Sequence, residues 1–147
     1  MHSQLNPNGG GMMRQKRAIV LLALALASCT SAQDMMDAAR AANRSKLIQL
    51  QPGMDRETVL RTMGTTPMKI RDLGSVVATI NNPFRTEMYQ ANGHRFEILY
   101  YYTDLKSGDG GITDDELTPL LIKDGVLDGW GWSYLKDVSA KYEIRIR

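Results

Sequence analysis

The segment RTEMYQANGHRFEILYYYTD, residues 85–104, decides the fold class of this chain. Asn92-Gly93 is a dipeptide typical of a two-residue turn, and aromatic and β-branched residues surround it. We therefore expect a β-hairpin whose arms cover residues 85–90 and 95–104. Because alternate side chains of a strand point to opposite faces, the second arm has two distinct faces. One face carries Phe96, Ile98, Tyr100 and Tyr102, and the other carries Glu97, Leu99, Tyr101 and Thr103.

A second hairpin is expected in LTPLLIKDGVLDGWGWSYL, which turns at Lys123-Asp124-Gly125. Trp130 and Trp132 are two residues apart in its second arm, so on an extended strand they share a face. Further upstream, residues 68–73 and 75–80 have the β-branched content of two shorter strands.

The segment GMDRETVLRTMGTTP, which follows Pro52, has the signals of a short helix. Asp55 is a suitable N-cap, Val59 and Met63 lie on one apolar face, and Gly64 suits the end of the helix. A helix over 55–63 is therefore expected. Residues 30–42 are expected to form a tether that becomes helical towards its end. Residues 37–50, DAARAANRSKLIQL, have the helix-forming composition of a second helix, with a disordered spacer as the alternative for its first part. Together these elements predict an α+β fold, with two short helices on one face of a small antiparallel sheet of about three to four strands.

The N-terminal segment has the features of a secretory signal. Arg14, Lys16 and Arg17 precede ten apolar residues, AIVLLALALA, at 18–27, which is about half the length needed to cross a bilayer. The alternative is a buried helix, but the run has no polar face. Its end, LASC, resembles a bacterial lipobox, in which the thiol of Cys29 is acylated and cleavage precedes that cysteine.

This resemblance implies three parts of the chain. Residues 1–28 are an N-terminal extension and a signal peptide that is removed, residues 29–44 are a lipid-anchored tether, and residues 45–147 are the folded domain. One acyl chain holds a protein weakly, at about 0.8 kcal/mol per buried methylene, so several chains on Cys29 are needed for firm anchoring. Thr30, rather than aspartate, follows the cysteine, which favours the outer membrane of a Gram-negative cell.

Two families of small bacterial lipoproteins resemble the rest of the chain. The helical segment resembles the SmpA/OmlA (BamE-like) outer-membrane lipoproteins, with matches at Gly53, Met54, Asp55, Val59, Leu60, Gly64 and Pro67. The C-terminal half resembles a related lipoprotein family of unassigned function, through Leu99-Tyr100-Tyr101, Thr103, 113–120 and 124–131. The resemblance spans residues 47–134 and implies helices packed on a small antiparallel sheet.

Composition excludes several classes of function. The 147 residues are 43% hydrophobic and 23% charged, which is ordinary for a globular protein. Without residues 1–28 the chain has 15 basic and 16 acidic side chains, so its charge gives no reason to expect nucleic-acid binding. One cysteine and two histidines exclude a disulfide framework and a multi-cysteine zinc site.

The acidic loop at residues 105–116 partly resembles a calcium-binding loop. Gly110 and Glu116 fit positions 6 and 12 of an EF-hand loop, but Leu105 stands where the first acidic ligand belongs. A solvated loop is the preferred interpretation, and no metal or cofactor is expected.

No catalytic set is expected either. His94 is predicted to be a solvated turn residue, and Asp114, Asp115 and Glu116 to be solvated charges. Adjacent carboxylates on a loop act as an acid–base pair only where burial or neighbouring charges shift their pKa values.

The aromatic residues leave two interpretations open. Trp130, Trp132 and the tyrosines of the first hairpin are core residues, or they contribute to a binding surface. In the second case Leu99 and Tyr101 lie on a bare face of the sheet and form a partner site, together with the tryptophans. The expected function is a non-enzymatic, protein-binding accessory in envelope assembly or maintenance, on the periplasmic side of the outer membrane. The alternative is an inhibitor or ligand-binding module that acts on an envelope enzyme or on peptidoglycan.

Overall fold

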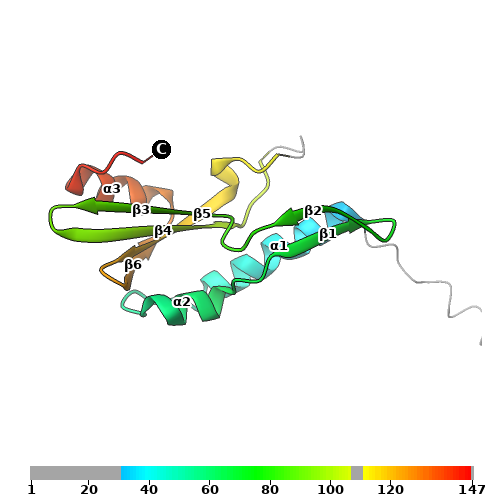
Figure 1. Ribbon diagram of the computed structural model, residues 1–147, viewed down its shortest axis with the longest axis horizontal. Helices are drawn as coiled ribbons and strands as arrows, with labels where there is room; N and C mark the ends of the chain where they lie inside the picture. Colours follow the sequence, from blue (N-terminus) through cyan, green and yellow to red (C-terminus); the bar gives the residue numbers. More distant parts are fainter. Residues whose placement is uncertain (1–30, 107–110, 147) are drawn as a thin grey trace, which may run out of the picture.

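The computed structural model describes residues 31–106 and 111–146 and has an α+β fold (Figure 1). The helices in this part of the chain are α1 (Ala32–Leu47), α2 (Arg56–Met63), the 3-10 helix η1 (Asp114–Glu116) and α3 (Trp132–Tyr142). The strands are β1 (Met68–Asp72), β2 (Ser75–Ile80), β3 (Arg85–Ala91), β4 (His94–Tyr102), β5 (Leu117–Lys123) and β6 (Val126–Trp130). The predicted fold class is confirmed.

Four strands form one antiparallel sheet in the order β3-β4-β5-β6. Both predicted hairpins are present: β3 and β4 pair from Ala91↔His94 outward, and β5 and β6 from Lys123↔Val126. The chain before α2 covers the outer edge of β6 through two backbone hydrogen bonds. The Gly53 N–H donates to the Leu127 carbonyl at 2.8 Å, and the Leu127 N–H donates to the Met54 carbonyl at 2.8 Å.

The helix α2 forms where the sequence predicts it. The carboxylate of Asp55 accepts a hydrogen bond from the backbone N–H of Thr58 at 2.9 Å, which satisfies one free donor of the first turn. The predicted apolar residues Val59 and Met63 are fully buried against the four-stranded sheet, and Gly64 is the C-cap.

The predicted helix in this region is present as α1, but it begins at Ala32, so most of the stretch predicted as a tether (29–44) is helical and belongs to the folded unit. Ser31 and Asp34 make a capping box at its first turn, each side chain accepting from the other's backbone N–H. Near the other end, the buried amide of Asn43 donates to the carbonyl of Tyr102 at 2.9 Å. These contacts fix α1 on the end of β4.

The helix α3 was not predicted, and the predicted second arm of the last hairpin was too long. The strand β6 ends at Trp130, and Gly131, with a φ of +92°, turns the chain into α3 at Trp132. Leu135 and Val138 of α3 are buried against the four-stranded sheet. The two tryptophans therefore do not share a strand face.

The four-stranded sheet is consequently covered on both faces. Phe96, Ile98 and Tyr100 belong to the same buried cluster as α3, whereas Leu99 and Tyr101 pack with α2. One face was expected to be bare, and α3 together with α2 removes that possibility.

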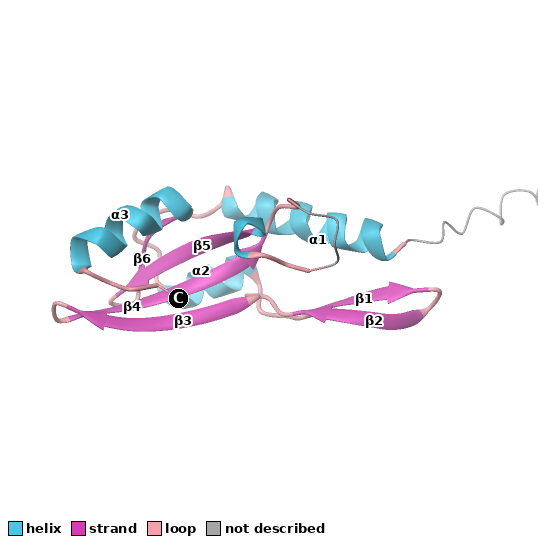
Figure 2. Cartoon of the chain, turned by 90° about the horizontal axis from the view of Figure 1, so that it is seen from above, coloured by secondary structure: helices cyan, strands magenta, loops and turns pink. Residues whose placement is uncertain are grey.

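The strands β1 and β2 form a separate two-stranded sheet (Figure 2). Ile70 and Ile80 are buried, and Met35 and Met36 of α1 pack against their cluster. The β1–β2 hairpin therefore lies along α1 and extends beyond the four-stranded sheet.

Candidate binding surfaces

The partner surface predicted at Leu99 and Tyr101 is wrong, because both side chains are buried. Leu99 is 1% exposed and Tyr101 0% exposed, and both lie beneath α2. The Tyr101 hydroxyl is buried without a hydrogen-bond partner, and burial raises the pKa of this group to about 12. A partner could reach neither residue without displacing α2.

The two predicted tryptophans have different environments. Trp130 is half-buried and packs against the cluster of α2 and the sheet. Trp132 is 38% exposed, and its indole N–H donates to the Leu117 carbonyl at 2.7 Å. Its ring lies 5.8 Å from that of Tyr100, between centroids. Of the four predicted residues, Trp132 alone presents a rigidly held aromatic ring to solvent.

Trp132 contributes to the lining of two hollows. The larger, of about 350 Å³, is lined mainly by apolar side chains of α3 and the C-terminal segment. Its residues are Trp132, Leu135, Lys136, Ser139, Ile144 and Ile146. The smaller, of about 240 Å³, is lined by Trp132, Asp114 and Asp115, and the surface it presents is mostly apolar. We call these two hollows together the Trp132 groove.

A charged network supports the acidic side of the Trp132 groove. The Arg85 guanidinium contacts Asp114 at 2.8 Å and lies 4.1 Å from the centroid of the Tyr100 ring. Glu87 accepts hydrogen bonds from the hydroxyls of Tyr89 (2.7 Å) and Tyr100 (3.1 Å), and burial raises the pKa of Tyr100. Asp114 is therefore exposed, as predicted, and is also ion-paired with Arg85. The Arg85–Asp114 ion pair joins β3 to η1, which lie far apart along the chain, so no local sequence pattern indicates it.

Glu116, unlike Asp114 and Asp115, is not the solvated charge that was expected. It is fully buried, and its carboxylate accepts hydrogen bonds from the backbone N–H groups of Lys106 (2.7 Å) and Thr113 (3.1 Å). This carboxylate, which fitted position 12 of an EF-hand, therefore joins the two ends of the loop. Residues 107–110 of that loop lie outside the described residues. Among the residues that the structure does describe, no cluster of His, Cys, Asp and Glu could hold a metal ion.

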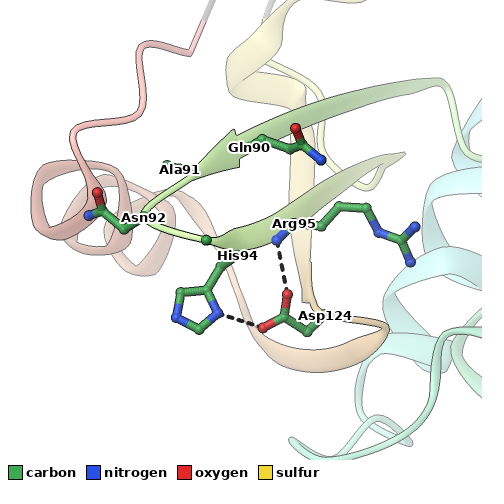
Figure 3. A pocket seen from close by; sticks show the side chains of 7 residues that line it. Gln90, Ala91, Asn92, His94, Arg95 and Asp124 are labelled. Atoms are coloured by element: carbon green, nitrogen blue, oxygen red, sulfur yellow. Dashed lines mark hydrogen bonds and ion pairs between the residues drawn. The ribbon is translucent and has the colours of Figure 1, made fainter.

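A polar pocket of about 370 Å³ lies between the turns of the two long hairpins (Figure 3). His94 Nδ1 lies 2.7 Å from Asp124 Oδ2, and the backbone N–H of Arg95 donates to Asp124 Oδ1 at 2.9 Å. The Arg95 amide, followed by His94, holds the pKa of Asp124 below its usual value. The His94 ring also stands edge-on to that of Tyr142, at 5.6 Å between centroids. His94 is thus half-buried and paired, which corrects its prediction as a solvated turn residue.

The predicted signal segment and Cys29 lie outside the described residues. In the part of the chain that is described, no helix is both long enough and apolar enough to cross a bilayer.

Comparison with known proteins gives one result. No curated protein and no solved structure matches the chain. A family model described as "Protein of unknown function (DUF3192)" matches residues 20–137, which include most of the apolar run and every described element up to the middle of α3. The chain therefore belongs to the DUF3192 family.

Proposed function

We propose that this protein is a lipid-anchored, non-enzymatic accessory that binds another protein in assembly or maintenance of the outer membrane and cell envelope. Acylation of Cys29 would hold it on the membrane, with the domain in the periplasm. The resemblance to SmpA/OmlA (BamE-like) lipoproteins supports this role.

One structural observation supports the anchor. The N-cap of α1 is Ser31, only two residues after Cys29. The lipobox-like pattern therefore ends two residues before the cap of α1, which is compatible with removal of the segment that precedes Cys29. An acylated Cys29 would hold α1 within about 7 Å of the attachment point, because a fully extended chain spans at most about 3.6 Å per residue.

The Trp132 groove is the surface that best fits a protein partner. Exposed aromatic rings in apolar hollows, with charge at the rim, are typical centres of protein interfaces. The apolar lining suits one aliphatic or aromatic side chain, and the exposed carboxylate of Asp115 suits a basic residue beside it. We therefore expect a partner segment with an apolar residue followed or preceded by lysine or arginine.

Crosslinking in living cells tests this assignment. A photo-crosslinking amino acid at Lys136, an exposed residue of the groove, should capture one specific envelope protein. The matched control is Arg61, which is exposed on α2. Asp115→Lys in the Lys136 probe background should reduce the adduct several-fold. Identical patterns from Lys136 and Arg61, or an adduct unaffected by Asp115→Lys, would contradict the assignment.

The polar pocket at His94 favours a second candidate, a ligand-binding module that acts on peptidoglycan or an envelope enzyme. Its lining of Gln90, Asn92, His94, Arg95 and Asp124 suits a polar, hydrogen-bonding ligand. Soluble peptidoglycan fragments should then shift the NMR resonances of His94 and Asn92 but not those of Trp132. Unchanged spectra would remove this candidate.

A further inference from the structure

Three two-residue turns in this chain have the same backbone conformation but different first residues. The turns are Leu73-Gly74 (φ +46° and +84°), Asn92-Gly93 (φ +52° and +79°) and Asp124-Gly125 (φ +51° and +87°). Positive φ at both positions is the requirement of a type I′ turn, which selects Asn, Asp or Gly at the first position. Two turns follow this rule, and the β1–β2 turn places a leucine in a conformation that leucine rarely adopts.

Neither turn geometry nor core packing explains Leu73. Its side chain is 90% exposed, and Val76 and Val77 of the same hairpin are also exposed. Three exposed apolar residues on one hairpin, one of them unfavourable for its turn, point to a contact outside the chain.

The position of the turn indicates what that contact is. The β1–β2 hairpin runs along α1, and its turn lies at the N-terminal end of that helix (Figure 1). The backbone N–H of Arg71 reaches the sulfur of Met35, in the second turn of α1, at 3.3 Å. Cys29 is two residues before the N-cap Ser31, so the acyl chains and Leu73 would lie at the same end of the molecule. The Asn92-Gly93 turn lies at the opposite end (Figure 2).

We propose that the β1–β2 turn is a second membrane contact, in which Leu73 enters the interfacial layer of the bilayer that holds the lipid on Cys29. This rests on the proposed acylation of Cys29. Lys69, Arg71 and Asp72 are exposed on the same hairpin, so two positive charges face one negative charge, and the excess of one favours contact with lipid phosphates. A single lipid attachment leaves a domain free to rotate about it. A second contact fixes the orientation of the domain on the membrane.

The test uses the full chain, acylated in cells and reconstituted in vesicles of phosphatidylethanolamine and phosphatidylglycerol. An environment-sensitive fluorophore is attached through Leu73→Cys, and in the matched control through Asn92→Cys, which occupies the same turn position. The Leu73 probe should shift to the blue on reconstitution and be quenched several-fold more by lipid-borne quenchers than the Asn92 probe. Equal, water-like emission from both probes would overturn the inference.

Two further outcomes separate this inference from the proposed function. If mass spectrometry shows that Cys29 carries no acyl chains, both are overturned. If Cys29 is acylated and the Leu73 probe stays in water, only the membrane contact is wrong. Shielding of that probe in native envelopes but not in lipid vesicles would assign Leu73 to a protein partner and overturn the lipid contact.

A variant that keeps the fold provides an independent check. Leu73→Asn suits the turn better, so the protein should remain folded with an unchanged or higher melting temperature. Labelled at Val77→Cys, beside the turn, this variant should lose the quenching by lipid-borne quenchers that the parent with Leu73 shows. Quenching that persists in Leu73→Asn would contradict a contact made by the leucine.

Discussion

The two sheets of this protein differ in what their residues contact. In the four-stranded sheet, every residue from Phe96 to Tyr102 of β4 is buried, because α2 covers one face and α3 the other. In the two-stranded sheet, every residue of β2 except Ile80 is exposed. A two-stranded hairpin is marginal by itself, and this one is held by its contact with α1. Stability therefore comes mainly from the first sheet, and the second is available for contacts outside the chain.

The largest effect should separate the two sheets directly. Leu99→Ala removes a buried side chain beneath α2 and should cost about 2–5 kcal/mol of unfolding free energy. Val77→Ala, at a residue that is 56% exposed on β2, should change it by about 0.5 kcal/mol or less. Urea unfolding followed by circular dichroism measures both. Similar losses in the two variants would show that the hairpin is part of the core.

A close approach on the α3 side should give the next largest effect. A Cβ added at Gly129 of β6 would lie 2.5 Å from the ring of Tyr134 in α3. Gly129→Ala should therefore cost about 1–3 kcal/mol through overpacking. Combining it with Tyr134→Ala tests the cause, because most of the added cost should vanish without the ring. If Gly129→Ala costs the same unfolding free energy with and without the ring, the Tyr134 ring is not in close contact with Gly129.

The turns should show a smaller effect of opposite sign in the two sheets. Leu73→Asn should stabilise the protein by about 1 kcal/mol, since the left-handed conformation is costly for leucine. Asn92→Leu should destabilise it by a similar amount, because it introduces the same conflict into the β3–β4 turn. Thermal unfolding of the two variants and the parent gives both values. A loss of stability in Leu73→Asn would show that leucine has a structural role in its turn.

The smallest effect is a pH dependence at the far end of the four-stranded sheet. The pKa of Asp124 is lowered in the folded state, so its carboxylate stabilises the fold above the unfolded pKa of about 3.9. This contribution is lost as the pH falls through the lower folded pKa. Asp124→Asn should therefore melt below the parent at pH 6, and the difference should shrink in more acidic solution. A difference that does not change with pH would exclude the ionised carboxylate as its source.

Local signals account for what could be predicted of the fold. The Asn92-Gly93 and Asp124-Gly125 turns, and the cap and apolar face of α2, each lie within a few neighbouring residues, and all were found from the sequence. The helix α3 was missed because Trp130, Gly131 and Trp132 have the composition of a strand, and a glycine at positive φ redirects the chain between them.

The candidate site was less predictable, since it depends on contacts between distant segments. Leu99 and Tyr101 were assigned to a surface because no second covering layer was expected, and Trp132 was named for a strand face that does not exist. The pairs Arg85–Asp114 and His94–Asp124 join residues about thirty positions apart, and pairings of this kind follow only from the folded topology. Leu73 is not among the predicted site residues. A leucine before glycine between two strand-like segments differs from the Asn, Asp or Gly that such a turn favours, so the sequence did contain this signal.

The mass of the N-terminal peptide of the protein, purified from membranes of a Gram-negative cell, tests the central claim most directly. The account predicts a mature chain that begins at Cys29 and carries the added mass of acyl chains on that residue. A chain that retains residues 18–28, or that has a free thiol at Cys29, would contradict it.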